Sequence, residues 1–326
     1  LSRDPPSANP LDLKCSTFIV KSSQLLSLTS NDWIKQTGND IDRSFPSEET
    51  IHTLKRVRSI ARKDPSYFII ENIEKGEITS EGILLSRYFP SLFLKSFLLN
   101  ATVLEKLKQI YFEIPSQTDG IYFSYLDRSF LIDLYRMGIS TFWLDKTTQS
   151  ILQFAIKSTN ESGMFVPIDK VKTFEESTMI GVYGSHIIRD NVEHIVSDLL
   201  SGLLQLKMRT NHPLLNPNTP LSLVTGGGMG AMDLGNQKAK ELGILSCGQL
   251  VDFRIRRKGK IIHEETPNPH IEAKMTYRLE QLVERQSDFR LDFPIFLKGG
   301  FGTDFEFVLE QLRRNFSTKT PTPVLL

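Results

Sequence analysis

The sequence predicts an α/β fold, with a Rossmann-like, doubly wound parallel sheet in the C-terminal half and a mixed α/β domain before it. After residue 176, apolar runs typical of strands alternate with helical patterns of about 10–15 residues, as in parallel sheets covered on both faces. Two of these runs pass directly into glycine-rich turns. The length of 326 residues favours two domains. We place the boundary in the polar stretch 160–177, which gives domains at 1–175 and 176–326.

In the C-terminal domain, the apolar positions define a repeated order of strand and helix. The predicted strands are 179–183, 221–224, 244–250 and 293–297, and the predicted helices are 192–204, 231–242, 271–286 and one that opens at 302. Ligands of such sheets bind beyond the carboxyl ends of the strands, so we expect the site there.

The N-terminal domain carries no motif that indicates chemistry, and we interpret it as a folding and oligomerisation domain. Its predicted strands are 18–20, 67–71, 121–125, 140–144 and 151–156, and its predicted helices are 47–63, 91–112 and a segment around 130–135. Residues 1–16 are rich in Pro, Ser and Asn and are expected to be a poorly ordered lead-in.

Composition and charge argue against several classes of protein. The net charge of +1 gives no field that would draw nucleic acid or an anionic membrane. No apolar run approaches the roughly 20 residues of a transmembrane helix. Two cysteines, Cys15 and Cys247, do not form a disulfide framework and fit a cytoplasmic protein. The chain starts at Leu1 and ends in the strand-like run 323–326, so we expect missing residues at both ends and a truncated C-terminal domain.

The stretch 297–306 is the strongest candidate for a binding site. A strand, two glycines and a helix that opens at Gly302-Thr303 bring free backbone N–H groups and the positive helix end to one point, which suits a phosphate. Glu306 lies one turn into this helix and is close enough to act on whatever the phosphate anchors. The alternative is that Thr303 and Glu306 form a capping box that only satisfies the helix end.

Two further strand ends carry glycines that suit a ligand. Three consecutive glycines, Gly226, Gly227 and Gly228, are more than a tight turn requires and favour close approach of the backbone to a ligand. The segment continues through Gly230 to Met232, and it matches neither the dinucleotide fingerprint nor the P-loop. Gly184 and Ser185 are expected to contact substrate, since no motif supports a nucleophilic serine.

Charged and metal-ligating residues complete the candidates. Arg278 lies beside the apolar stripe of the predicted helix 271–286, where its guanidinium must be paired or face a polar cavity. The basic segment 253–263 is interpreted as a solvated hairpin tip, or alternatively as a grip on a second anionic ligand or a neighbouring subunit. The histidines show no metal-ligand spacing and nothing indicates a cofactor, so we predict neither.

At these residues the chain resembles the LOG (LONELY GUY) family of nucleoside 5′-monophosphate phosphoribohydrolases, and most closely its long branch, the bacterial pyrimidine/purine nucleotide 5′-monophosphate nucleosidases. The similar segments are Thr225-Gly226-Gly227-Gly228-Met229-Gly230-Ala231-Met232, Arg278-Leu279-Glu280, Lys298-Gly299-Gly300-Phe301-Gly302-Thr303-Asp304-Phe305-Glu306, Val182–His186 and Pro267–Pro269. They cover residues 178–326. Lys298 and Phe305 depart from the motif, and Arg278 precedes Glu306 by 28 residues, about five more than in the short members.

The resemblance implies hydrolysis of the N-glycosidic bond of a nucleoside 5′-monophosphate to free base and ribose 5-phosphate. It implies that Arg278 and Glu306 are the catalytic pair, and that Gly299, Gly300, Gly302 and Thr303 hold the phosphate. It also implies a homo-oligomer with the site close to a subunit interface. The alternatives are a catalytically silent nucleotide-binding or sensing protein on the same fold and a purely structural assembly protein.

Overall fold

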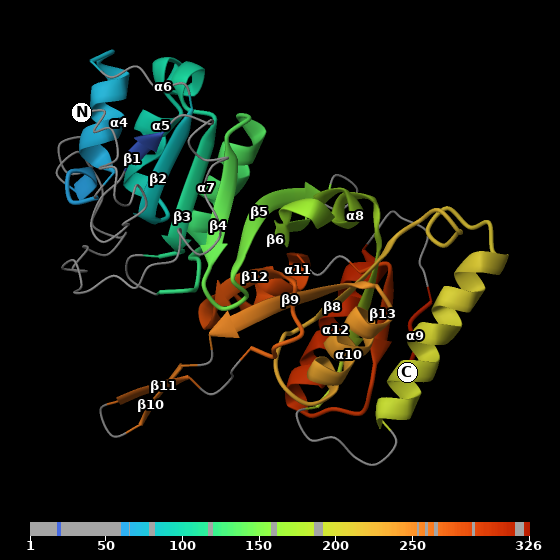
Figure 1. Ribbon diagram of the computed structural model, residues 1–326. Helices are drawn as coiled ribbons and strands as arrows, with labels where there is room; N and C mark the ends of the chain where they lie inside the picture. Colours follow the sequence, from blue (N-terminus) through green and yellow to red (C-terminus); the bar gives the residue numbers. More distant parts are fainter. Residues whose placement is uncertain are drawn as a thin grey trace. The chain divides into compact units, whose positions relative to one another are not determined.

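The computed structural model divides the chain into two compact units, Leu1–Phe154 and Ala155–Leu326 (Figure 1). It describes residues 18–20, 60–64, 66–77, 82–116, 120–157, 162–185, 192–252, 254–257, 260–263, 267–288, 291–316 and 323–326. The division comes earlier in the chain than the predicted boundary at 175/176. Residues 162–176 belong to the second unit because β6 (Ser162–Pro167) pairs with a strand of its sheet and α8 (Val171–Glu176) contacts another.

The first unit is built on three parallel strands with an antiparallel strand on each side. The strand order is β1 (Phe18–Val20), β2 (Ile83–Tyr88), β3 (Gln109–Ile114), β4 (Ser140–Asp145) and β5 (Ser150–Lys157), of which β5 crosses the division after Phe154. Its helices are α4 (Tyr67–Glu74), η2 (Leu92–Leu94), α5 (Lys95–Leu98), α6 (Ala101–Lys106) and α7 (Tyr125–Arg136). Buried aromatic rings fill its core, among them Phe89, Phe112, Phe123, Phe130 and Trp143.

Three predictions for this unit are wrong and four are confirmed. The segment 67–71 is the start of helix α4, because Tyr67, Ile70 and Ile73 face the core at helical spacing. The predicted helix 91–112 is instead η2, α5, α6 and then strand β3, and the predicted strand 121–125 runs into α7. The strands at 18–20, 140–144 and 151–156 and the helix around 130–135 are confirmed. Most of the predicted helix 47–63 lies outside the described residues.

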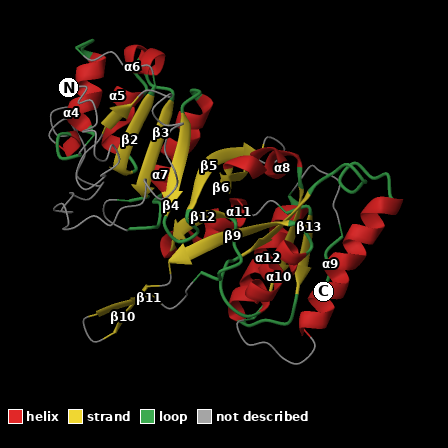
Figure 2. Cartoon of the chain, in the orientation of Figure 1, coloured by secondary structure: helices red, strands yellow, loops and turns green. Residues whose placement is uncertain are grey.

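The second unit contains a doubly wound sheet with the strand order β6, β12, β9, β8, β7, β13 (Figure 2). The parallel strands are β7 (Thr178–Tyr183), β8 (Leu221–Thr225), β9 (Leu245–Asp252), β12 (Ala273–Arg278) and β13 (Phe293–Phe296). The helices are α9 (Val192–Arg209), α10 (Ala231–Glu241), η4 (Leu279–Gln281), α11 (Leu282–Asp288) and α12 (Phe301–Asn315). A short 3-10 turn, η3 (Ile168–Lys170), precedes α8.

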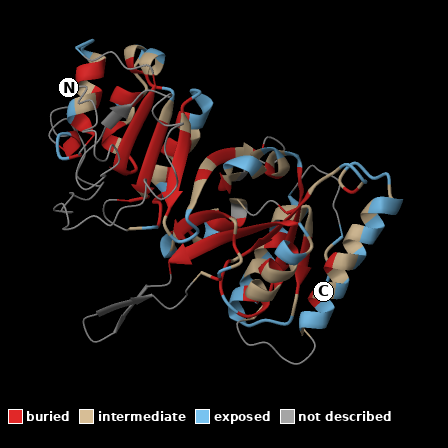
Figure 3. Cartoon of the chain, in the orientation of Figure 1, coloured by how far each residue is buried: buried red, intermediate tan, exposed pale blue. Residues whose placement is uncertain are grey.

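Helices cover both faces of this sheet, which buries its central strands (Figure 3). Ile180 and Val182 of β7 form a core cluster with Val196 and Leu200 of α9. On the opposite face, the rings of Tyr183 and Phe296 stack, and Phe296 meets Phe307 of α12 edge-on. The predicted doubly wound parallel sheet is therefore confirmed.

The sheet reverses its winding between β7 and β13, which are neighbours although they are the first and last strands of the parallel set. Such a switch point opens a crevice at the carboxyl ends of the strands. The predicted helix 271–286 is wrong, since its first part is strand β12. Residues 273–278 read Ala-Lys-Met-Thr-Tyr-Arg, so apolar and polar side chains alternate with the period of a strand, although residues 273–277 are all buried.

Two smaller features complete the second unit. A separate hairpin pairs β10 (Arg254–Arg257) with β11 (Lys260–His263), as predicted for the basic segment. Near the end of the chain, Leu325 forms an isolated parallel bridge with Ile295 of β13. None of the helices that the structure describes is both long and apolar enough to cross a membrane.

Candidate functional site

A cavity of about 220 Å³ lies at the switch point of the second unit. It is lined by Gly184, Ser185, Gly226, Met232, Val251, Arg285, Gly300, Gly302, Thr303 and Glu306. These residues follow or end the parallel strands β7, β8, β9 and β13, or lie on α10, α11 and α12, the helices that follow β8, β12 and β13. The predicted location beyond the strand ends is thus where the cavity occurs.

The cavity contains an ion pair between Arg285 and Glu306. The Nη2 of Arg285 lies 3.1 Å from Oε1 of Glu306, and the two side chains are only 5% and 16% exposed. The Nε of Arg285 donates to the backbone carbonyl of Gln249 at 3.1 Å. Because the guanidinium is held at two of its nitrogens, it fixes the direction of the carboxylate by a charge-assisted hydrogen bond.

This pairing differs from the sequence analysis, which gave the arginine's role to Arg278. Arg278 is the last residue of β12, and its backbone amide donates to Oε1 of Gln281 at 3.2 Å. Of the described residues, Arg285 lines the cavity and Arg278 does not. The physical reason is the change of element: the chain leaves the sheet after Arg278, and α11, which carries Arg285, contacts α12.

Sequence spacing held a signal that points to Arg285. Arg285 precedes Glu306 by 21 residues, whereas Arg278 precedes it by 28. The expected separation was about five shorter than 28, which is nearer to the value for Arg285. The separation of 28 residues therefore exceeds the expected one because it is counted from Arg278 rather than from Arg285 on α11.

The helix end next to Glu306 has no side-chain cap. Helix α12 begins at Phe301, with Gly300 as the N-cap residue and no side-chain hydrogen bond to the cap. The alternative interpretation of Thr303 and Glu306 as a capping box is wrong, because Thr303 is already inside the helix and Gly300 is the N-cap residue. The first backbone hydrogen bond of the helix runs from the amide of Asp304 to the carbonyl of Gly300. Three amides come before it at the start of the helix, those of Phe301, Gly302 and Thr303. Such a helix start attracts an anion.

Of the three glycines at this helix start, only Gly299 is required by contact. A Cβ atom on Gly299 would lie 2.0 Å from Oγ1 of Thr303, so any side chain there would displace the loop. At Gly300 and Gly302 a Cβ would meet no atom within 4 Å. Because both glycines line the cavity, the space beside the start of α12 is open there.

The glycine loop after β8 approaches the arginine closely. A Cβ on Gly226 would lie 2.9 Å from Sδ of Met232 and 3.0 Å from Nη2 of Arg285. Gly227 has a positive φ of 81°, a conformation that favours glycine. A Cβ on Gly184 would lie 2.7 Å from Cβ of Ala231. Because glycine has no Cβ, the start of α10 can pack directly against the residue after β7.

A buried tyrosine lies beneath the ion pair. Tyr183 accepts a hydrogen bond from Nε2 of Gln286 at its hydroxyl, at 3.0 Å. Burial, followed by the negative charges of Glu306 and Glu310, raises the pKa of Tyr183 well above its usual value of 10.0. Tyr183 therefore remains a neutral support for the pair rather than a base. The sequence analysis missed this residue, since an apolar strand gives no signal for it.

The predicted site residues divide into two groups. Eight of them line the cavity: Gly184, Ser185, Gly226, Met232, Gly300, Gly302, Thr303 and Glu306. Gly227, Gly228, Gly230 and Gly299, like Arg278, are not among the described residues that line it. Gly299 shapes the turn before α12, and Gly230, with a φ of 76°, is the N-cap residue of α10.

Other chemistry is not indicated at this site. No group of three or more His, Cys, Asp or Glu side chains that could hold a metal ion occurs within the described ranges. Cys247 is buried, and burial raises the pKa of its thiol, so it is not poised as a nucleophile. What the arrangement offers is a positioned carboxylate, a fixed guanidinium and a helix end that suits a phosphate.

Comparisons with known proteins add little to this geometry. No protein-family model and no curated protein sequence matches the chain. Among solved structures, the chain is similar to the X-ray structure of TM1055, a structural genomics target, at 18% identity and a TM-score of 0.31, over 45% of this chain and 72% of that one. It is also similar to a molybdenum cofactor binding protein from the phototrophic bacterium Rippkaea orientalis, at 17% identity and a TM-score of 0.29, over 45% and 74%. At these values the similarity carries no argument about activity.

Proposed function

We propose that the second unit hydrolyses the N-glycosidic bond of nucleoside 5′-monophosphates, giving free base and ribose 5-phosphate. The observation that carries this proposal is the pairing of Glu306 with Arg285 in a cavity that the uncapped start of α12 also lines. The carboxylate of Glu306 lies about one helical turn after the amides at the start of α12, which would bind the phosphate. That spacing suits a ribose whose 5′-phosphate is anchored while its C1′ reacts.

In the proposed reaction, the phosphate binds the amides at the start of α12. Because both the phosphate and the carboxylate site are fixed, the ribose is held as in an intramolecular reaction. The bond from C1′ to the base nitrogen breaks through an oxocarbenium-like state, and the oxygen of a water molecule forms the new bond to C1′. Glu306 stabilises the positive charge and accepts a proton from that water, the departing base takes up a proton from solvent, and Glu306 then returns its proton to solvent.

Arg285 has a positioning role in this scheme. Its two hydrogen bonds, to Gln249 and to Glu306, hold the carboxylate in one orientation. Without Arg285, the nearly buried carboxylate of Glu306 would be an unpaired charge that destabilises the fold, and it would be free to rotate. Met232 and Val251 add apolar surface to the same cavity, which suits the flat face of a base.

The test is release of base from a panel of nucleotides. Purified protein is incubated with AMP, GMP, CMP, UMP and IMP, and free base is measured by chromatography. We expect release from at least one of them, lost in Glu306→Ala. Saturable binding without release from any of them would support the alternative, a silent nucleotide-binding protein. No binding at all would overturn both.

We further propose that the protein is a homo-oligomer in which a second copy covers α12. One face of this helix exposes five apolar side chains: Phe301, Phe305, Val308, Leu312 and Phe316, at 94%, 36%, 54%, 47% and 85% exposure. Their spacing of three and four residues forms a continuous helical stripe. Their exposed area is on the order of 700 Å², near the amount that each partner buries in a stable interface. The stripe begins between Gly300 and Gly302, so the second copy would border the cavity.

A further inference from the structure

A fully buried network of amides lies behind the glycine loop of the cavity. Asn236 of α10 is 0% exposed and uses its whole side-chain amide in four hydrogen bonds. Its Nδ2 donates to Oγ of Ser246 at 2.8 Å and to the carbonyl of Cys247 at 3.1 Å. Since a carbonyl only accepts, this contact fixes which end of the amide is nitrogen. Its Oδ1 then faces the glycine loop.

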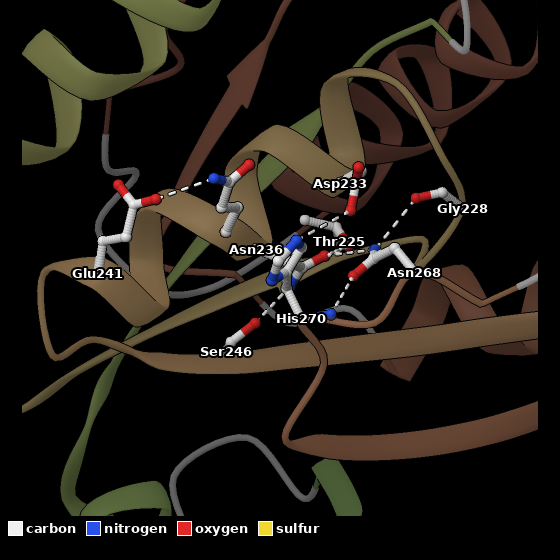
Figure 4. Close-up of polar contacts among 9 residues, drawn as sticks. Thr225, Gly228, Asp233, Asn236, Glu241, Ser246, Asn268 and His270 are labelled. Atoms are coloured by element: carbon white, nitrogen blue, oxygen red, sulfur yellow. Dashed lines mark hydrogen bonds and ion pairs between the residues drawn. The ribbon is translucent and has the colours of Figure 1, made fainter. Parts of the chain in front are cut away.

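Asn268 connects this network to the loop (Figure 4). Its Nδ2 donates both to Oδ1 of Asn236 and to the carbonyl of Gly228, each at 3.0 Å. Its backbone amide donates to the carbonyl of Gly227 at 2.9 Å. Its own Oδ1 accepts from the amide of His270 at 3.1 Å. One asparagine, 3% exposed, thus holds two successive carbonyls of the loop.

These bonds determine which part of the loop meets the cavity. Gly227 is anchored at both of its polar groups, because its amide donates to Oγ1 of Thr225 at 3.0 Å and its carbonyl is held by Asn268. Gly227 and Gly228 are therefore held on the network side, and Gly226 is the loop glycine that lines the cavity beside Arg285. Because Asn268 binds the carbonyls of Gly227 and Gly228, the lone pairs of these two oxygens do not point toward an anionic ligand in the cavity.

We propose that Asn268, supported by Asn236, is a positioning residue for nucleotide binding: it holds the glycine loop so that Gly226 stays against Arg285. This inference rests on the proposed function. Asn268 does not itself line the cavity, so it acts through the loop and through Arg285. The expected effect is on binding of substrate more than on the bond-breaking step.

The test compares the KM and kcat of Asn268→Asp with those of the wild type. The aspartate keeps the shape but loses the donor, and it sets oxygen against the carbonyl of Gly228 and Oδ1 of Asn236. We expect KM for the best nucleotide to rise by about tenfold or more and kcat to fall by less than about threefold. Calorimetry with ribose 5-phosphate should show the same weakening without any turnover.

A matched control and a second variant keep the test decisive. Ser222→Ala removes a buried hydroxyl that donates to Oγ of Ser177 at 2.6 Å, away from the cavity, and should leave KM unchanged. If Asn268→Asp does not fold, Thr225→Val, which removes the hydroxyl between Gly227 and Asn236, should raise KM by several-fold.

The outcomes separate this inference from the proposed function. If the wild type releases base and Asn268→Asp or Thr225→Val keeps the KM of the control, the positioning role is overturned and the function stands. If a variant loses kcat alone, the positioning role is likewise overturned. If the wild type neither releases base nor binds ribose 5-phosphate, the proposed function fails and this inference fails with it.

Discussion

The guanidinium of Arg285 lies between the carboxylate of Glu306, 3.1 Å away, and the backbone carbonyl of Gln249, also at 3.1 Å. The pair joins α11 and α12 to the end of β9. Removing one member of such a nearly buried pair leaves an uncompensated charge, which costs both orientation and stability. The pair is therefore the place where substitution should be most informative.

Arg285→Ala should lower kcat/KM by about a hundredfold or more, because Glu306 loses the group that orients it. It should also lower the free energy of unfolding by up to about 3 kcal/mol. Arg285→Lys restores the charge but not both hydrogen bonds, so we expect it to recover only part of the activity. Arg278→Ala is the matched control and should keep kcat/KM within about threefold of the wild type. The reverse pattern would return the role to Arg278.

Gly299→Ala should weaken phosphate binding, because the added Cβ would lie 2.0 Å from Oγ1 of Thr303 and must displace the loop before α12. We expect the Kd of ribose 5-phosphate, measured by calorimetry, to rise by about tenfold or more. Gly202→Ala, in helix α9 with no atom within 4 Å of the added Cβ, is the control and should leave that Kd unchanged. Equal Kd values for the two variants would argue against phosphate binding at this helix end.

The protein should lose stability at alkaline pH because of Tyr183. Its pKa is raised in the folded protein, so above pH 10 the unfolded chain loses the phenolic proton that the folded protein keeps. This contribution to stability is complete below about pH 10 and is lost as pH rises further. Denaturant unfolding between pH 8 and pH 11 should show a smaller decline for Tyr183→Phe than for Tyr125→Phe, a change at an exposed position. Identical declines would contradict the buried, neutral tyrosine.

The apolar stripe of α12 should hold copies of the chain together. A double substitution, Phe305→Asp with Val308→Asp, places charge in the middle of the stripe and should give a monomer by light scattering. Ile195→Asp with Met208→Asp, at exposed apolar positions of α9, is the matched control and should keep the wild-type mass. A monomeric wild type, or the same mass for both double variants, would contradict a second copy on α12.

Much of the second unit could be predicted from the sequence, because short apolar runs bounded by glycine are typical of buried parallel strands. The strands at 179–183, 221–224 and 293–297 and the glycine turns after them are present. The segment 271–286 was interpreted as one helix because Met275, Leu279, Leu282 and Val283 lie at helical spacing, although the alternation of residues 273–278 is typical of a strand. The boundary between strand and helix was also hard to place from the sequence, because η4 and α11 follow β12 without a gap.

The candidate site was predictable where glycine turns mark the strand ends and where its residues follow one another in sequence. Glu306 and the start of α12 follow one another, so their closeness follows from helix geometry. Arg285 is fixed by the carbonyl of Gln249, a contact across 36 residues that no local pattern encodes. Asn268 and Asn236 meet across 32 residues for the same reason. Polar residues that act through tertiary contacts need the fold before their partners can be named.

The most direct measurement is the stoichiometry of products from a nucleoside 5′-monophosphate with wild-type protein and with Glu306→Gln. The account predicts that the wild type releases free base and ribose 5-phosphate in equal amounts. It predicts that Glu306→Gln binds the same nucleotide with similar Kd and releases neither product at a measurable rate. Cleavage by Glu306→Gln at the wild-type rate, or a wild type that binds nucleotide and leaves its glycosidic bond intact, would contradict it.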